Sequence, residues 1–185
     1  MSRLFLNFVF SAVVTTAPVL AVANCADLCQ ADFYQTATAD TVQQLIAAGA
    51  DVNARDKDGK TPLHWVSQAT PDTIRALLAA GADVNATDSL DRTPFHFVSA
   101  MAAPETVTLF LAIGAEVNAK TANDWTPLHG AAKFGTPEVI RILLEAGADA
   151  SATNEMGETP FDLAASNDRV KASPEYQVLQ DAKGQ

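Results

Sequence analysis

Basic side chains are scarce in this chain, and their scarcity argues against one large class of function. Among 185 residues there are 12 Lys and Arg against 22 Asp and Glu, which gives a net charge of -10 at pH 7. No basic run offsets this charge, and so acidic a surface repels phosphate backbones. We therefore expect no nucleic acid among the partners. The chain is still 48% hydrophobic, which is enough apolar material for a folded protein.

Motifs that carry catalysis are also missing. The sequence has no nucleophile paired with a base, no glycine-rich phosphate loop and no helix pattern that presents two metal ligands. Most acidic residues instead recur at regular intervals, in positions typical of turns and helix starts. We therefore expect no enzymatic activity, no cofactor, no metal and no small-molecule substrate.

The N-terminus differs in composition from the rest of the chain. Residues 4–23 are mostly apolar, follow Arg3 and end in Ala21-Val22-Ala23. A basic start, an apolar middle and a small-x-small end are typical of a cleavable secretory signal peptide. We predict a signal peptide over residues 1–23, cut near Ala23/Asn24, and a periplasmic or secreted protein. The alternative is a membrane anchor over residues 4–23, since about 20 apolar residues can span a bilayer.

Cysteines are few, and both lie just beyond the expected cleavage site, at Cys25 and Cys29. A redox-active pair would favour the spacing C-x-x-C, and a metal site would need two more ligands nearby. In an oxidising compartment such a pair tends to close. We predict a structural disulfide between Cys25 and Cys29, worth about 2 kcal/mol for so short a loop.

Two short phrases return along the chain at a nearly fixed interval. The first occurs as Thr61-Pro62-Leu63-His64, Thr93-Pro94-Phe95-His96, Thr126-Pro127-Leu128-His129 and Thr159-Pro160-Phe161-Asp162. The intervals are 32, 33 and 33 residues (61 to 93, 93 to 126, 126 to 159). The second phrase is Gly-Ala-Asp-Val-Asn-Ala at Gly49 to Ala54, and its related copies begin at Gly81, Gly114 and Gly147. Two phrases in phase indicate stacked copies of one small unit.

Each copy reads as a turn followed by two short helices. Thr61 suits the N-cap of the first helix, and Pro62 suits its first position, where the missing N–H costs nothing. The second helix carries apolar residues at i, i+3 and i+4, as in Ile74, Leu77 and Leu78, and this stripe must be buried against neighbours. A glycine such as Gly81 then ends the helix. The expected fold class is all-α.

On these phrases the chain resembles the ankyrin-repeat family, whose Thr-Pro-Leu-His-x-Ala pattern recurs about every 33 residues. The resemblance implies an α-solenoid of helix-turn-helix units joined by β-turn loops. The predicted units are an N-terminal capping half-repeat at 24–55, full repeats at 56–87, 88–120 and 121–153, and a C-terminal capping repeat with a tail at 154–185. End units normally deviate from the pattern, because one of their faces meets water.

The same resemblance implies a structural role for the histidines. His64, His96 and His129 occupy the same slot of successive copies, where the family's imidazole bonds backbone in neighbouring turns. The rival interpretation is a hydrolase or metal-dependent enzyme that uses the histidine row. The repeating position favours the structural role.

In such arrays the turn tips and the exposed side of the first helices form a concave surface, where partners usually dock. Residues that break the repeat pattern there are the candidate contacts. We predict partner binding at Lys60, Leu90, Arg92, Met101, Trp125, Lys133, Phe134 and Met156. Exposed apolar clusters of this kind mark interaction sites. The alternative is that Trp125 lies against the next turn and that Phe134 covers the end of a second helix.

The sequence therefore predicts an exported, monomeric, non-catalytic module that binds another protein through its concave surface. A second hypothesis is an accessory or protective factor for a periplasmic enzyme, for example in oxidative stress defence. Membrane association is expected only if the leader stays uncleaved.

Overall fold

The computed structural model describes residues 28–183, and in this range all regular secondary structure is helical. The predicted signal peptide and Cys25 lie outside the described residues. The helices, in chain order, are α2 (Ala31–Thr36), α3 (Ala39–Ala47), η1 (Pro62–Gln68), α4 (Pro71–Ala79), α5 (Pro94–Met101), α6 (Pro104–Ala112), α7 (Pro127–Phe134), α8 (Pro137–Glu145), α9 (Pro160–Ala164), α10 (Asp168–Lys171) and α11 (Pro174–Lys183).

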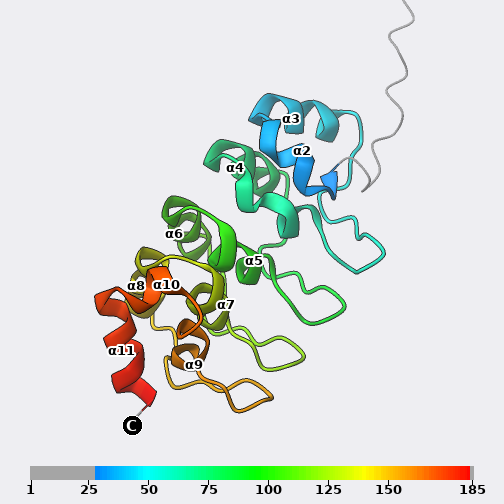
Figure 1. Ribbon diagram of the computed structural model, residues 1–185. Coiled ribbons are helices and arrows are strands. Elements are labelled where there is room, and N and C mark those ends of the chain that lie inside the picture. The colour runs from blue at the N-terminus through cyan, green and yellow to red at the C-terminus, as the bar shows by residue number, and fades with distance from the viewer. Residues whose placement is uncertain (1–27, 184–185) are drawn as a thin grey trace, which may run out of the picture.

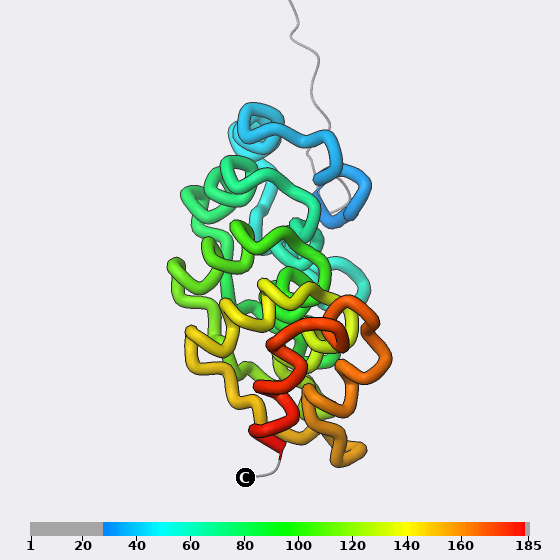
Figure 2. Tube along the Cα trace, turned by 60° about the vertical axis from the view of Figure 1, so that its left-hand side comes forward, coloured from blue at the N-terminus to red at the C-terminus, as the bar shows by residue number. Residues whose placement is uncertain are grey.

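The helices pair and the pairs stack in sequence order, so that the first and last units lie at opposite ends of an elongated molecule (Figure 1). The first helices α2, η1, α5, α7 and α9 form one row, and α3, α4, α6 and α8 form a second row behind it. The turns between copies project to one side beyond the first row. Seen after a rotation, the copies follow one another as successive layers (Figure 2). The expected all-α solenoid is confirmed for the described residues.

The expected apolar stripe of the second helices forms the seam between copies. Ile74 and Leu77 of α4, and Ile140 and Leu143 of α8, are fully buried, and Leu78 is partly buried against the same core. One continuous cluster of buried residues runs through the stack. Each unit thus buries its apolar flank only against the next, as stacked repeats require.

The first full copy is one residue shorter than the others. Its first helix accommodates the difference by adopting a more tightly wound form. Its first helix, η1, is a 3₁₀ helix of 7 residues, whereas α5 and α7 are α-helices of 8 residues. A 3₁₀ helix rises about 2.0 Å per residue and an α-helix about 1.5 Å. Seven residues of the one therefore span about as far as eight of the other, and the copy keeps its place in the stack.

Side-chain amides tie the second-helix ends of adjacent copies together. Asn53 donates from Nδ2 to the carbonyl of Gly81 (2.9 Å), and its Oδ1 accepts from the Asp83 N–H (2.9 Å). Asn85 makes the same pair of bonds to Gly114 and Glu116, and Asn118 makes it to Gly147 and Asp149. We call this set the asparagine ladder. It explains why the first three glycine phrases end in Val-Asn-Ala, with Asn four residues after the glycine.

Candidate protein-binding groove

The histidine row stands inside the stack and both of its ring nitrogens are occupied. In each copy Nδ1 accepts the backbone N–H of the capping threonine, at 3.0 Å from Thr61 to His64. Nε2 faces a carbonyl of the next copy, so it carries the proton and donates. His64 bonds Arg92 O at 2.9 Å, His96 bonds Trp125 O at 3.1 Å and His129 bonds Glu158 O at 3.1 Å. We call this set the histidine ladder.

Burial keeps these imidazoles neutral. Desolvation lowers the pKa of His64, His96 and His129, and it outweighs the carbonyl bonds that favour the charged form. A nitrogen that already accepts one bond and another that already donates leave no lone pair for a metal. Within residues 28–183 no group of three or more His, Cys, Asp or Glu side chains is arranged to hold a metal ion.

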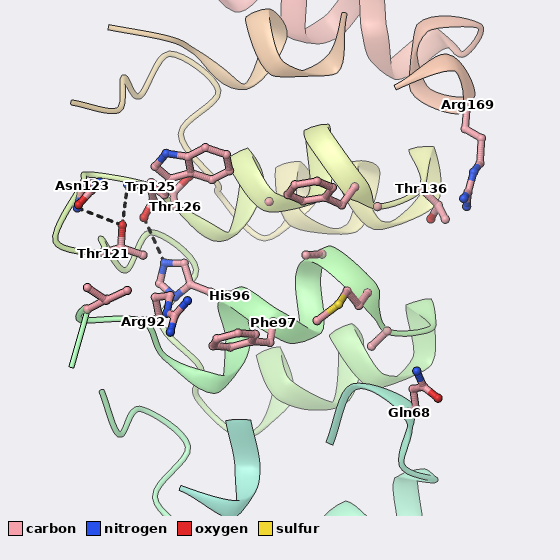
Figure 3. Close-up of a pocket in the computed structure, with 17 residues that line it drawn as sticks. Gln68, Arg92, His96, Phe97, Thr121, Asn123, Trp125, Thr126, Thr136 and Arg169 are labelled. Carbon is pink, nitrogen blue, oxygen red and sulfur yellow. Dashed lines mark hydrogen bonds between the residues drawn. The ribbon is translucent and has the colours of Figure 1, made fainter. Parts of the chain in front are cut away.

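A groove of about 820 Å³ opens between the first helices α5 and α7. Phe97 and Met101 of α5 line one wall, and Gly130 and Phe134 of α7 line the other. Figure 3 shows Trp125 and Thr121 of the turn at one end of the groove, and Arg169 and Gln68 toward the other. The groove lies on the side of the molecule formed by the first helices and the turns.

A missing side chain opens this groove. Gly130 occupies the slot that Trp65 fills in η1 and Phe97 fills in α5. A Cβ at Gly130 would lie 3.4 Å from Ala100 Cβ and 3.5 Å from His96 O, which is ordinary contact. Glycine is therefore not required here for packing or backbone conformation. Its effect is to leave room where the two preceding copies carry an aromatic ring.

Several apolar side chains on the groove face water. Met101 is 60% exposed, Phe134 59% and Leu90 49%, and all three line the groove. In the described part of the chain only Met156 and Val178 are other large apolar residues this exposed. Three of the five exposed apolar side chains thus gather at one opening.

Cations and aromatic rings alternate beside the groove. Lys60 Nζ lies 4.2 Å from the centre of the Trp65 ring and 4.9 Å from that of Phe97. Lys133 Nζ lies 5.3 Å from the Trp125 ring and 5.5 Å from the Phe134 ring. Contacts at these distances hold a cation by its attraction to the ring face. The lysines are thereby positioned along the groove rather than extended freely into solvent.

The Arg92 guanidinium also lies over Phe97, at 5.0 Å, and bonds the buried carboxylate of Asp88. Burial alone would raise the pKa of Asp88. The hydrogen bonds from Arg92 and from two backbone N–H groups outweigh it, so the pKa is held below the usual value. Asp88 in turn accepts the N–H groups of Leu90 and Arg92, and so shapes the turn that carries both residues.

The groove brings together five of the eight predicted contacts: Leu90, Arg92, Met101, Trp125 and Phe134. Lys60 and Lys133 adjoin it through their ring contacts, while Met156, at 73% exposure, does not line it. Trp125 is half buried and lies over His129 with ring centres 5.9 Å apart, so it both packs and borders the groove. Phe134 stays largely exposed rather than covering a second helix.

Sequence reasoning missed Arg169, which lines the far end of the groove from the C-terminal unit. Its neighbour Asn167 donates to the carbonyls of Ala132 and Gly135, both at 3.1 Å, and so attaches this segment to the end of α7. No repeated phrase covers this segment, so no signal in the sequence placed it there.

Two other predictions, the Cys25–Cys29 disulfide and the alternative membrane anchor over residues 4–23, depend on residues outside the described range. Cys29 is buried, but its predicted partner Cys25 lies outside the described residues, so the disulfide stays a prediction. Among residues 28–183 no helix combines the length and the apolar character needed to cross a bilayer.

Comparison with known proteins agrees with this architecture. A search of curated proteins gave no match. The family model for ankyrin repeats in three copies matches residues 31–121 and again residues 95–173. The two matches together span most of the chain, including both walls of the groove and Arg169. The chain therefore belongs to the ankyrin-repeat family.

Proposed function

We propose that this protein is a non-catalytic, exported binding module that captures another protein in the groove between α5 and α7. Ankyrin repeats are typical protein–protein interaction modules. The groove lies where the first helices and turns of such an array are open to a partner. The apolar leader of residues 4–23 supports export to the periplasm or beyond.

The main support for this proposal is the concentration of exposed apolar side chains at one opening. Leu90, Met101 and Phe134 all line the groove and are each about half exposed or more. Apolar side chains held in water around a hollow gain free energy when a partner covers them. Trp125 and Arg92 beside them are residue types enriched among interface residues that dominate binding energy. The histidine ladder offers no comparable binding surface, because its imidazoles are neutral and both ring nitrogens already make hydrogen bonds.

A capture experiment tests this proposal. Tagged protein is purified from cells that express the full chain and is used as bait against the exported fraction of the native host. The variant Met101→Ser/Phe134→Ser removes two groove side chains, and Met156→Ser/Val178→Ser removes two apolar side chains elsewhere that are half exposed or more. We expect the groove variant to lose the captured protein and the control variant to retain it.

Equal capture by both variants, with both folded as judged by circular dichroism, contradicts the proposed site. The identity of the captured protein separates general scaffolding from the protective-factor hypothesis, which requires an enzyme of the same compartment. Export has its own readout, since the mass of the recovered protein shows whether residues 1–23 have been removed.

A further inference from the structure

We infer that the groove takes an extended, acidic peptide segment of the partner, with one bulky apolar side chain inserted beside Gly130. This inference rests on the proposed function and specifies the chemistry of the partner. It follows from three features of the groove: its charge, the positioning of its cations and the space left by Gly130.

The charge of the groove is opposite to that of the chain. The whole sequence carries 22 acidic residues against 12 basic ones. Yet no Asp or Glu is among the residues that line the groove within the described part of the chain, whereas Arg92 and Arg169 are. Lys60 and Lys133 add two further positive charges along its border. The lining of the groove is therefore positive, in contrast to the acidic protein as a whole.

Three of these cations lack an acidic partner. In residues 28–183 no ion pair involves Lys60, Lys133 or Arg169, whereas Arg75, Arg92 and Arg141 are each paired with a carboxylate. A carboxylate that arrives with a partner would meet these cations without first displacing an internal one. Charge complementarity of this kind favours an acidic partner and steers its approach.

The side chains of Lys60 and Lys133 are also positioned by ring contacts before any partner binds. Lys60 spans the rings of Trp65 and Phe97, and Lys133 spans those of Trp125 and Phe134. Side chains that are already ordered lose less conformational entropy when a ligand binds. The aromatic faces below them offer apolar contact at the same time. A segment that alternates carboxylates with apolar carbon matches this surface.

The space beside Gly130 sets the position of one bulky side chain. The two preceding copies fill this slot with Trp65 and Phe97, so Gly130 omits an aromatic side chain that those copies carry on this face. Phe97 and Phe134 form apolar surfaces on the two sides. An inserted Phe, Trp or Leu of a partner would restore the contact that the other copies make internally.

A peptide fits this site better than a nucleic acid does. The exposed turn-tip residues Asp91 and Asp124 lie beside the groove, and Asp124 is paired with Lys120. A long polyanion would run past these carboxylates and over the remaining acidic surface, where it is repelled. A short acidic segment that lies between α5 and α7 avoids both.

Selection from a phage-displayed library of random linear peptides tests the inference. The bait is protein purified from cells that express the full chain. The charge variant is Lys60→Gln/Lys133→Gln/Arg169→Gln, and its control is Arg75→Gln/Arg141→Gln/Lys171→Gln, which removes the same number of positive charges from residues that do not line the groove. We expect selected peptides rich in Asp and Glu around one aromatic residue or Leu.

Synthetic copies of those peptides should bind the charge variant roughly tenfold more weakly than the control, because three favourable charge contacts of modest strength are lost. Their affinity should also fall as salt rises. Peptides that need Met101 and Phe134 but are neutral or basic overturn the inference and leave the proposed function standing. A library with no peptide that depends on Met101 and Phe134 contradicts both. Equal binding of a single-stranded oligonucleotide, lost in the charge variant, overturns the choice of a peptide.

Discussion

The third repeat and the C-terminal unit both carry the Thr-Pro phrase but differ at the position that reaches toward a following copy. His129 accepts the Thr126 N–H at 3.1 Å and donates forward to Glu158 O. In the last unit Asp162 takes the place of the histidine. It accepts the Thr159 N–H at 2.9 Å but makes no bond to the backbone of a further copy. Asp162 Oδ1 instead accepts from Lys183 of α11.

The asparagine ladder ends in the same way. Asn118 of the second full repeat bonds Gly147 O and the Asp149 N–H of the following copy. Ser151 of the third repeat, after which no further glycine phrase comes, has a hydroxyl that bonds the Asp149 carboxylate two residues earlier. The difference teaches what the repeated residues do. His and Asn are kept where a following copy is present to accept their bonds, and a shorter residue that satisfies only the local turn suffices at the end.

The largest effect on stability is expected when the aspartate of the terminal unit replaces the histidine of an interior copy. His129→Asp keeps an acceptor for the Thr126 N–H but loses the bond to Glu158 O and places a charge at a fully buried site. We expect a loss of about 3 to 5 kcal/mol in the free energy of unfolding. Urea denaturation followed by helical circular dichroism measures it. The reverse change, Asp162→His, loses only a partly exposed pair and should cost about 1 kcal/mol or less. Similar losses in the two variants would show that position in the stack does not matter.

A second comparison concerns the turn glycines at the two ends of the repeat array. Gly59 and Gly157 have φ of 77° and 76°, so alanine is strained at both, by about 1 to 2 kcal/mol. At Gly59 a Cβ would also lie 3.1 Å from the Ser89 backbone N, whereas at Gly157 it meets nothing within 4 Å. That nitrogen donates to Asp58 O and links the two turns. Gly59→Ala should therefore lower the urea midpoint more than Gly157→Ala does, and equal midpoints would mean that the contact between turns contributes nothing.

The asparagine ladder offers a smaller effect. Asn118→Ser removes two hydrogen bonds between copies and should cost about 1 to 2 kcal/mol. Ser151→Asn adds an amide for which the C-terminal unit offers no glycine phrase to bond, so the unfolding free energy should stay within about 0.5 kcal/mol of the parent value. A stabilising Ser151→Asn would contradict the account of the terminal unit.

The smallest expected effect is on the pH dependence of stability, because the ladder histidines and Asp162 act in different pH ranges. The lowered pKa of each ladder histidine means that the unfolded chain binds the proton more readily, so stability falls as pH drops below about 6.5. The pKa of Asp162 is also lowered, chiefly by its hydrogen bond from Lys183, so its contribution is lost only below about 3.8. Between pH 7.5 and 6, each histidine should cost less than about 1 kcal/mol. Hydrogen exchange should show the interior copies losing protection in this range. His96→Gln should reduce the pH dependence, and an unchanged dependence would contradict the assignment.

Much of this fold follows from local sequence, because each repeat carries its own caps, turns and apolar stripe. Thr-Pro phrases and turn glycines predicted the helix pairs, and Asp91 and Asp124 take positive φ of 56° and 58° at the slots that Gly59 and Gly157 fill elsewhere. The 3₁₀ form of η1 was not predictable from the sequence, since it depends on how the stack accommodates a copy that is one residue short.

The groove was predicted only in outline. Residues that break the pattern, such as Met101 and Phe134, pointed to the first-helix surface. Met156 breaks the pattern equally but stands apart from the groove, because a deviation does not report its distance from the others. Arg169 comes from a tail without repeat phrases, and only the bonds of Asn167 place it.

The most direct test is to fill the groove from within. Gly130→Phe restores the residue that α5 carries at this slot, and Gly130→Ala, whose Cβ makes only ordinary contacts, leaves the groove open. The measurement is the affinity of both variants for the protein captured by the parent chain, by isothermal titration calorimetry. The account predicts that the alanine variant binds like the parent and that the phenylalanine variant, equally stable to urea, does not bind. Undiminished binding by the folded phenylalanine variant would contradict it.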